Sequence, residues 1–356
     1  MDTDQQQQQQ QQATASHTTH SIDLEAFAQQ FSQVPVVVAY VFSFVSLHLV
    51  AALPQRLWRH VGCQITQLVM DTHDTAEWRF WCGLSFADAF EWGRRLTRLN
   101  SIVVKCPRSL RIPSETAGLF YYDNYDTVLS SVKKEIVTAL VEGHIDGLRA
   151  AAATAAGRQA PTTLESIEII KGESTITIDE AEGRGIRAAT EPSAHRLPPP
   201  LDPPPTLTSL TSITKYGYFH GPGRRRHWQL PSLERVQVEG RVCNDEVLGE
   251  LVATSRRLKE LHVECTPDTM AGSLRCIPVP TAGQPGPLSQ LEDIGTLCVS
   301  AERPRGGAEG LESLQRVLVD RGCSSIKKLG VELDCSIDSC IFATLSASRP
   351  SGVPSV

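Results

Sequence analysis

Few residues of this sequence have the types and spacing that catalysis requires. The motifs G-x-x-x-x-G-K-[ST], G-x-S-x-G and H-E-x-x-H, typical of phosphate loops, nucleophile elbows and zinc proteases, are missing. Residues 183–188, GRGIRA, have a GxGxxA form but follow a polar stretch, whereas a dinucleotide-binding turn follows a buried strand. His262 with Cys265, and His220 with His227, contain metal-ligating types, but scattered histidines are more often simply exposed. We predict no enzyme activity, no cofactor and no metal site.

One basic patch, residues 215–228 (KYGYFHGPGRRRHW), places three arginines among aromatic side chains. Such a combination can hold single-stranded nucleic acid through phosphate contacts and stacking. The whole chain has 34 Lys and Arg against 40 Asp and Glu, a net charge of -6, whereas nucleic-acid binders need clustered positive charge. We therefore predict a charged loop between strands and no nucleic-acid partner.

Composition divides the 356 residues into ordered and disordered parts. Residues 1–21 contain eight consecutive glutamines and predict a disordered tail, because they have too little apolar surface to offset the entropy of ordering. Residues 184–206 contain seven prolines, which remove backbone donors and favour an extended linker or surface loop. Residues 266–287, rich in Gly, Pro and Ser, also predict a loop, and 345–356 predict a second disordered tail.

The N-terminal part bears on the compartment. The first Lys or Arg is Arg56, so the basic region that begins a secretory signal is missing. We expect a cytoplasmic or nuclear protein whose ten cysteines stay reduced. The twenty residues Val34–Leu53 are nevertheless apolar enough and long enough to cross about 30 Å of hydrocarbon. A membrane span, a pair of core helices and a protein-docking module are three alternatives for this run.

The central and C-terminal parts combine helical patterns with a repeated triad. Apolar residues recur at three- to four-residue spacing in 74–95, 126–148, 244–257 and 308–322, which predicts helices. Most are followed by a segment of the form aliphatic, two residues, aliphatic, one residue, aliphatic. The copies are Ile65-Leu68-Met70, Leu99-Ile102-Val104, Leu164-Ile167-Ile169, Leu233-Val236-Val238, Leu258-Leu261-Val263, Ile294-Leu297-Val299 and Ile326-Leu329-Val331, with a defective copy at Leu210-Ile213 and Lys215 in third place. Several steps between copies match the repeat unit of a solenoid, about 20–30 residues; an ordinary α/β domain with short buried strands is the alternative.

Residues 230–265, in which strand, Cys-Asn turn, helix and strand follow in order, resemble the cysteine-containing leucine-rich repeats. The resemblance implies an α/β fold over 63–344, a leucine-rich-repeat-like solenoid with a curved parallel sheet and helices on its outer side. Alternation along the strands would then send one set of side chains to the concave face, where such solenoids bind partners. This set comprises Arg235, Gln237, Glu239, Glu260, His262, Glu264, Lys328 and Glu332.

The apolar run together with its continuation, residues 34–61 (VPVVVAYVFSFVSLHLVAALPQRLWRHV), resembles an F-box. The likeness lies in a hydrophobe-Pro start, a first helix ending in Phe-Ser-Phe, a Leu-rich second helix and a Trp. It implies a small helical module over 22–62 that docks on a Skp-type adaptor. The implied adaptor-binding residues are Pro35, Val41, Phe42, Phe44, Leu47, Leu49, Leu57 and Trp58.

An F-box followed by leucine-rich repeats is a recurrent pairing, so the two resemblances support one another. Together they imply a substrate-recognition subunit of a cullin-type ubiquitin ligase. The F-box would bind the adaptor and thereby the cullin scaffold, and the repeat face would bind a protein substrate. The alternative is a single-span membrane-anchored protein that uses Val34–Leu53 as its anchor and carries an α/β interaction domain.

Overall fold

The computed structural model describes segments between residues 23 and 334 that contain the triads and most of each predicted helix. The described residues are 23–42, 45–51, 61–71, 73–106, 109–111, 135–154, 162–171, 175–177, 198–216, 226–242, 245–300 and 304–334. The disordered tails predicted for 1–21 and 345–356, like the GxGxxA segment 183–188, lie outside these ranges.

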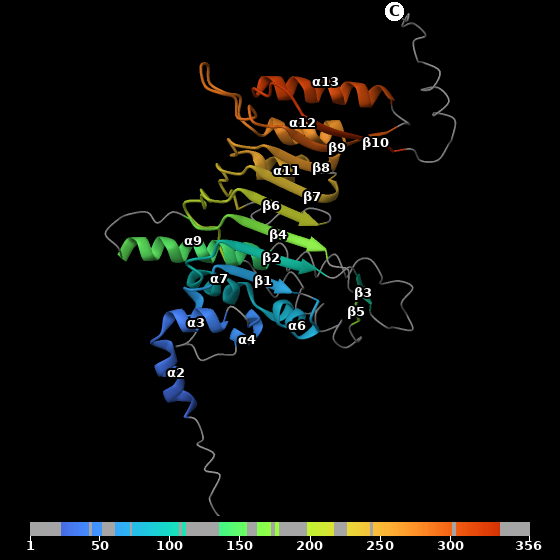
Figure 1. Cartoon of the computed structure of the whole chain (residues 1–356). Helices are drawn as coiled ribbons and strands as arrows, with labels where there is room; N and C mark the ends of the chain where they lie inside the picture. The colour runs from blue at the N-terminus through green and yellow to red at the C-terminus, as the bar shows by residue number, and fades with distance from the viewer. Residues whose placement is uncertain are drawn as a thin grey trace, which may run out of the picture.

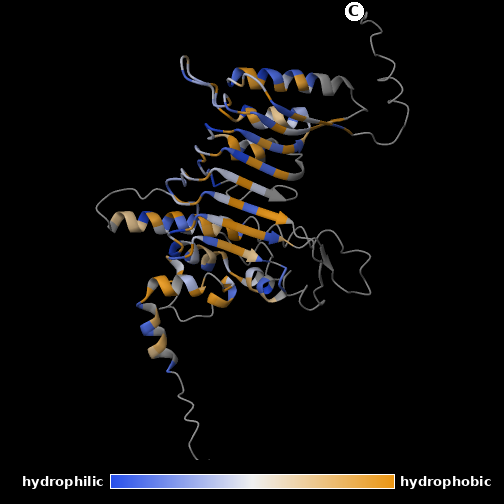
Figure 2. Ribbon diagram, in the orientation of Figure 1, coloured by the Kyte–Doolittle hydropathy of each residue, from blue (hydrophilic) through white to orange (hydrophobic). Residues whose placement is uncertain are grey.

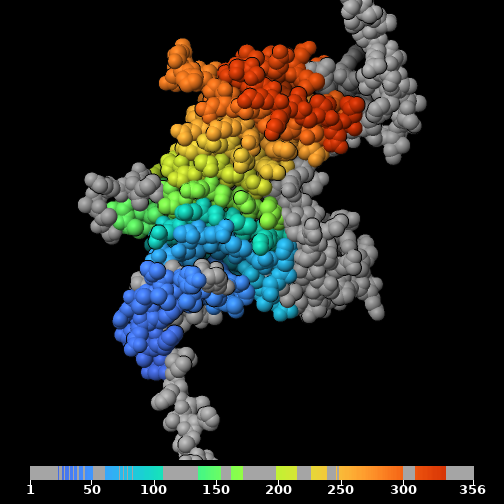
Figure 3. Space-filling view, viewed as in Figure 1, coloured from blue at the N-terminus to red at the C-terminus, as the bar shows by residue number. Residues whose placement is uncertain are grey.

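One open sheet of eight parallel strands forms the centre of the molecule, and its strands are neighbours in the order of the sequence (Figure 1). The strands are β1 (Gln67–Asp71), β2 (Ser101–Cys106), β4 (Ser166–Lys171), β6 (Ser212–Tyr216), β7 (Arg235–Val242), β8 (Glu260–Cys265), β9 (Asp293–Ser300) and β10 (Lys328–Asp334). The space-filling view shows the chain advancing from one end of the molecule to the other (Figure 3). An α/β fold with a solenoid-like advance is therefore present, and the prediction that the triads lie side by side is confirmed.

The triads set the register of the sheet. The middle residue of each triad aligns with the next across six strands, and all six are buried: Leu68, Ile102, Ile167, Ile213, Val236 and Leu261. One residue before each strand, backbone N–H groups form a second row of hydrogen bonds. From Asn100 to Lys327, seven such N–H groups each donate to the carbonyl of the equivalent residue one strand earlier, at 2.6–2.9 Å. The defective copy therefore forms a regular strand, β6, in spite of Lys215.

The last two triads are in a shifted frame. Asp293 aligns with Glu260, so Ile294 and not Leu297 continues the row of Leu261. A register shift follows, at Gly295, whose φ of 71° lies in a region that side chains with a Cβ rarely adopt. The sequence pattern did not reveal this shift. Ile294 and Leu297 are both buried on either side of Gly295, so the triad has the same spacing as the others.

Helices cover one face of the sheet. They are α6 (Thr75–Gly83), α7 (Phe86–Arg95), α9 (Val137–Thr154), α11 (Asp245–Val252), α12 (Pro267–Arg275) and α13 (Pro304–Asp320). The predicted helix 74–95 is in fact two, because the Ser85 side chain accepts from the Asp88 N–H and starts α7 anew. The loop predicted for 266–287 is correct only for residues 276–287, which contain neither helix nor strand. Its first part is α12: Thr266 caps the helix and Pro267 occupies its first turn, where a proline costs no hydrogen bond.

The other face of the sheet is polar, and Figure 2 shows the alternation of hydrophobic and hydrophilic residues along the strands. In β8, for example, Leu261, Val263 and Cys265 are fully buried while His262 is exposed. A separate pair of short parallel strands, β3 (Ser109–Arg111) and β5 (Thr175–Thr177), lies beside the main sheet.

In the described part of the chain, the helices α2 (Leu24–Ser32), α3 (Pro35–Phe42) and α4 (Leu47–Ala51) precede β1. The apolar run Val34–Leu53 is therefore not one continuous helix, since α3 ends at Phe42 and α4 begins only at Leu47. Among the described residues, none of the helices combines the length and the apolar character that crossing a bilayer requires.

Candidate interaction surfaces

The predicted concave-face residues gather on the polar face of the sheet. Seven of the eight have described side chains, and each is exposed or half-buried and points away from the helices: Arg235, Gln237, Glu260, His262, Glu264, Lys328 and Glu332. The side chain of Glu239 lies outside the described set, although its backbone belongs to β7. The strands β7 to β10 thus bring residues up to 97 positions apart, from Arg235 to Glu332, onto one surface.

Ion pairs organise one edge of this surface. Arg235 Nε and Nη2 donate to the two carboxylate oxygens of Glu260 at 2.5 and 3.2 Å. These hydrogen bonds lower the pKa of Glu260 and raise that of Arg235. Lys328 lies 4.0 Å from Asp293 one strand further along. The charges at the amino ends of the strands are therefore largely paired, which leaves His262 and Gln237 as the polar groups in the middle of the face.

A group of metal-ligating types lies at the other end of the same strands. The ligand atoms of Glu264, Cys298 and Glu332, on three adjacent strands, are within 4.8 Å of one another. The Cys298 thiol donates to Glu264 Oε1 at 3.7 Å. Two carboxylates and a thiol are donors that a divalent cation such as Zn²⁺ accepts. Sequence reasoning missed Cys298 because the three residues belong to three separate repeats.

The metal pairs considered from the sequence are not assembled in the described residues. His262 is exposed on the polar face, whereas Cys265 is fully buried on the helix side, so the sheet separates them. His227 is exposed, and His220 lies outside the described residues.

An exposed apolar surface lies at the opposite end of the molecule, on α2, α3 and α4. We call it the N-terminal apolar surface; its large side chains are 41–79% exposed and comprise Phe27, Val34, Val36, Val37, Tyr40, Val41 and Leu49. Scattered exposed apolar side chains are ordinary, but a contiguous group marks an interaction site or an assembly surface. This surface is the largest group of its kind among the described residues.

The predicted adaptor-binding residues are divided between this surface and the core. Val41 and Leu49 belong to the N-terminal apolar surface. Phe42 is half-buried with its ring against Phe31, and Leu47 is only 6% exposed. The side chain of Pro35 is outside the described set, as are Phe44, Leu57 and Trp58. Of the eight residues implied by the resemblance, the structure therefore places two on the N-terminal apolar surface and two in or against the core.

The basic patch is not simply a charged loop. Arg226 is buried and binds the buried Glu142 of α9, with Nε 2.7 Å from Oε1. Trp228 Nε1 donates to the same oxygen at 3.1 Å, and Arg226 Nη1 donates to the Pro198 carbonyl at 2.8 Å. Arg224 and Arg225 lie outside the described residues. Arg226 is thus a structural residue that joins α9 to the Pro-rich segment.

The described part of the Pro-rich segment packs on the same helix. Arg149 Nη2 donates to the Pro203 carbonyl at 2.9 Å, and Thr206 pairs with Gln229 in a parallel bridge. A cavity of about 410 Å³ lies between α9 and this segment. The predicted linker 184–206 is therefore, in its described residues, part of the packed domain.

A buried histidine predicts a pH dependence of stability. His144 Nδ1 lies 2.6 Å from the Leu96 carbonyl, while Nε2 is buried with no partner among the described atoms. Burial lowers the pKa of His144, and the hydrogen bond to Leu96 opposes that shift only in part. The unfolded chain thus binds a proton more readily, so stability is complete above the unfolded pKa of about 6.5 and is lost as pH falls below it. We expect urea unfolding from pH 8 to 5 to show this loss, with a slope of up to about 1.4 kcal/mol per pH unit.

The His144→Gln variant should lose that part of the pH dependence, because glutamine does not titrate. His262→Gln, at an exposed position, is the matched control and should keep it. Equal pH slopes for wild type and His144→Gln would contradict the assignment.

No protein-family model matches this chain, and no curated protein matches it.

Proposed function

We propose that this protein is a non-enzymatic interaction protein with two separate binding surfaces. The N-terminal apolar surface binds one partner, and the polar face of β7 to β10 binds another. The exposure of Val36, Tyr40 and their neighbours carries the proposal, since a helix pair that served only as core would bury these side chains.

The partners that we propose follow from the two sequence resemblances. The α2–α4 segment acts as an F-box-like module that docks on a Skp-type adaptor and thereby on a cullin scaffold. The sheet acts as a degenerate leucine-rich-repeat solenoid whose polar face holds a protein substrate for ubiquitin transfer. The ordered advance of eight strands and the outward side chains of Arg235, His262 and Glu332 support this use. The site of action is then cytoplasmic or nuclear.

The adaptor contact is tested with the full chain and a purified Skp-type adaptor. We expect a stable complex in gel filtration, and its affinity measured by calorimetry should fall at least about thirtyfold in the double variant Val36→Asp, Tyr40→Asp, since both side chains would lie in the centre of the interface. These two positions suit the test because Val36 is 79% and Tyr40 68% exposed, so the substitutions leave the core unchanged.

The matched control is Val279→Asp, another exposed apolar position, 62% exposed and far along the chain near β9. It should bind the adaptor as the wild type does. The proposal is wrong if the folded wild-type chain forms no complex with the adaptor, or if the double variant binds as well as the control.

A further inference from the structure

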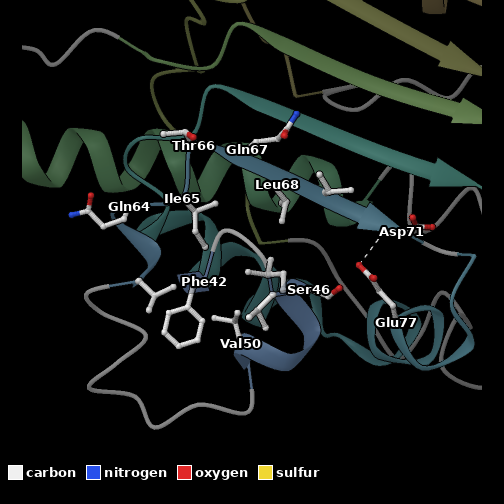
Figure 4. Close-up of a pocket in the computed structure, with 14 residues that line it drawn as sticks. Phe42, Ser46, Val50, Gln64, Ile65, Thr66, Gln67, Leu68, Asp71 and Glu77 are labelled. Atoms are coloured by element: carbon white, nitrogen blue, oxygen red, sulfur yellow. Dashed lines mark hydrogen bonds between the residues drawn. The ribbon is translucent and has the colours of Figure 1, made fainter. Parts of the chain in front are cut away.

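A cavity of about 400 Å³ lies between the N-terminal helices and the first strand of the sheet (Figure 4). Its apolar wall comes from α3, α4 and the residues around them: Phe42, Val45, Leu47, Val50 and Val61. The opposite wall is β1 itself, from Thr66 to Asp71. Met70 of that strand does not line the cavity and is fully buried in the core.

This cavity runs along the free edge of the sheet. β1 is the first strand in the sheet order, so among the described strands only β2 pairs with it, along one of its two edges. The Thr66 carbonyl accepts from Asn100 and Ser101, which directs the peptide groups of alternate residues toward β2. The backbone N–H and C=O groups of Gln67, Val69 and Asp71 therefore point away from β2. The Asp71 N–H confirms this direction, since it donates to Glu77 Oε1 at 3.0 Å and not to a strand.

The chemistry of the lining is uneven along the strand. Asp71 and Glu77 are the two charged residues among the described residues that line the cavity, and both are acidic. The Asp71 carboxylate already accepts from Lys105 Nζ at 3.3 Å and lies 3.0 Å from His73 Nδ1, so Glu77 supplies the carboxylate for a ligand. Glu77 is only 3% exposed, and its Oε1 accepts from the Asp71 N–H and from Trp81 Nε1 at 3.1 Å. Its Oε2 lies 3.7 Å from His48 Nδ1, a buried nitrogen without a hydrogen-bond partner. One end of the cavity thus holds a buried carboxylate with acceptor capacity to spare.

We propose that this cavity binds an extended peptide of a partner protein, which joins the sheet along the free edge of β1. The peptide groups of Gln67 and Val69 pair with its backbone, as in other complexes formed by strand addition. An apolar side chain of the peptide fills the wall formed by Phe42, Leu47 and Val50. A Lys or Arg of the same peptide lies at the end of the cavity that holds the buried carboxylate of Glu77.

Two properties of the site favour a peptide over a small molecule. A small ligand would leave the row of outward donors and acceptors on Gln67 and Val69 unpaired once water was displaced, which is costly. The acidic end also selects against anionic ligands, because their charge would face the buried carboxylate of Glu77. The edge itself is short, five residues from Gln67 to Asp71, so a heptapeptide spans it.

The test uses a display library of random heptapeptides selected on the full chain. We expect enriched sequences with alternating apolar residues and a Lys or Arg at one end. The best synthetic peptide should bind about tenfold more weakly when its backbone nitrogens facing β1 are methylated, since methylation removes the donors that pair with the edge.

Variants of the protein separate the parts of the site. Val69→Pro removes an outward N–H, a change that an edge strand tolerates, and Ser46→Trp fills the cavity from an exposed position. Each should weaken binding about tenfold or more. Glu77→Gln keeps an oxygen that accepts from Trp81, and it should lower the affinity only for peptides that contain the Lys or Arg.

The matched control is Leu329→Pro on β10, the opposite edge of the sheet, which should bind as the wild type does. Enrichment of no peptide on folded protein overturns the proposal, as does binding that Val69→Pro, Ser46→Trp and methylation all leave unchanged. The test of adaptor binding can fail separately, because its variant positions, Val36 and Tyr40, do not line the cavity.

Discussion

Arg226→Met should lower the free energy of unfolding by about 3–5 kcal/mol, because it leaves Glu142 buried without its counter-charge. Glu142 is fully buried in α9 and Arg226 is 7% exposed, so water cannot replace the lost partner. The substitution also removes the donors to the Pro198 and Pro199 carbonyls. Urea unfolding followed by circular dichroism measures the loss, and we expect the Pro-rich segment to become sensitive to protease at the same time.

Two further variants show whether charge is the cause. The double variant Arg226→Met, Glu142→Leu removes both charges and should recover much of the stability, since apolar pairs often replace buried ion pairs without loss. Lys327→Ala breaks an exposed pair of similar length, 2.7 Å to Glu292, and should cost less than about 1 kcal/mol. A loss in the double variant as large as that in Arg226→Met would show that packing, not the charge, stabilises this site.

The buried pairing of Arg226 with Glu142 could not be predicted from the sequence. Three consecutive arginines among aromatic residues indicate a surface patch, because solvated charge is the ordinary state of such a run. The partner of Arg226 lies 84 positions earlier, in a helix whose polar residue Glu142 interrupts an apolar face. The pairing of two residues so far apart depends on how the repeats stack. A residue pattern within one repeat therefore cannot predict it.

The strands were the predictable part. Each triad depends only on alternation within a few residues, and parallel stacking then brings Leu68, Ile102 and Ile167 into one buried row. The polar face followed from the same alternation, which is why Arg235, His262 and Lys328 lie where they were expected. The shift at Gly295 was not predictable, because a glycine in a strand marks either a bulge or a close approach.

The N-terminal segment was predictable only in outline. Its composition indicated short apolar helices as one of three alternatives, and α3 and α4 are such helices. The cavity beside β1 had no signal in the sequence, because its walls come from segments on both sides of Val61. The edge of a sheet also depends on strand order, which the triads do not specify by themselves.

Gly143→Ala should cost about 3 kcal/mol or more, because α7 and α9 pack too closely for a side chain at this position. A Cβ at Gly143 would overlap the Phe90 carbonyl oxygen of α7, and the backbone itself would have to move. The same is true one turn further on, where a Cβ at Gly147 would overlap the Arg94 carbonyl oxygen. The two helices would have to separate along their length, which would also loosen the packing around the buried His144.

Gly83→Ala is the matched control, since a Cβ at that position meets nothing within 4 Å. It should change the free energy of unfolding by less than about 1 kcal/mol, the ordinary difference in helix propensity between the two residues. Thermal and urea unfolding of both variants measure the difference. If Gly143→Ala were as stable as Gly83→Ala, the close approach of α7 and α9 would be wrong, and the position assigned to His144 would have to be revised with it.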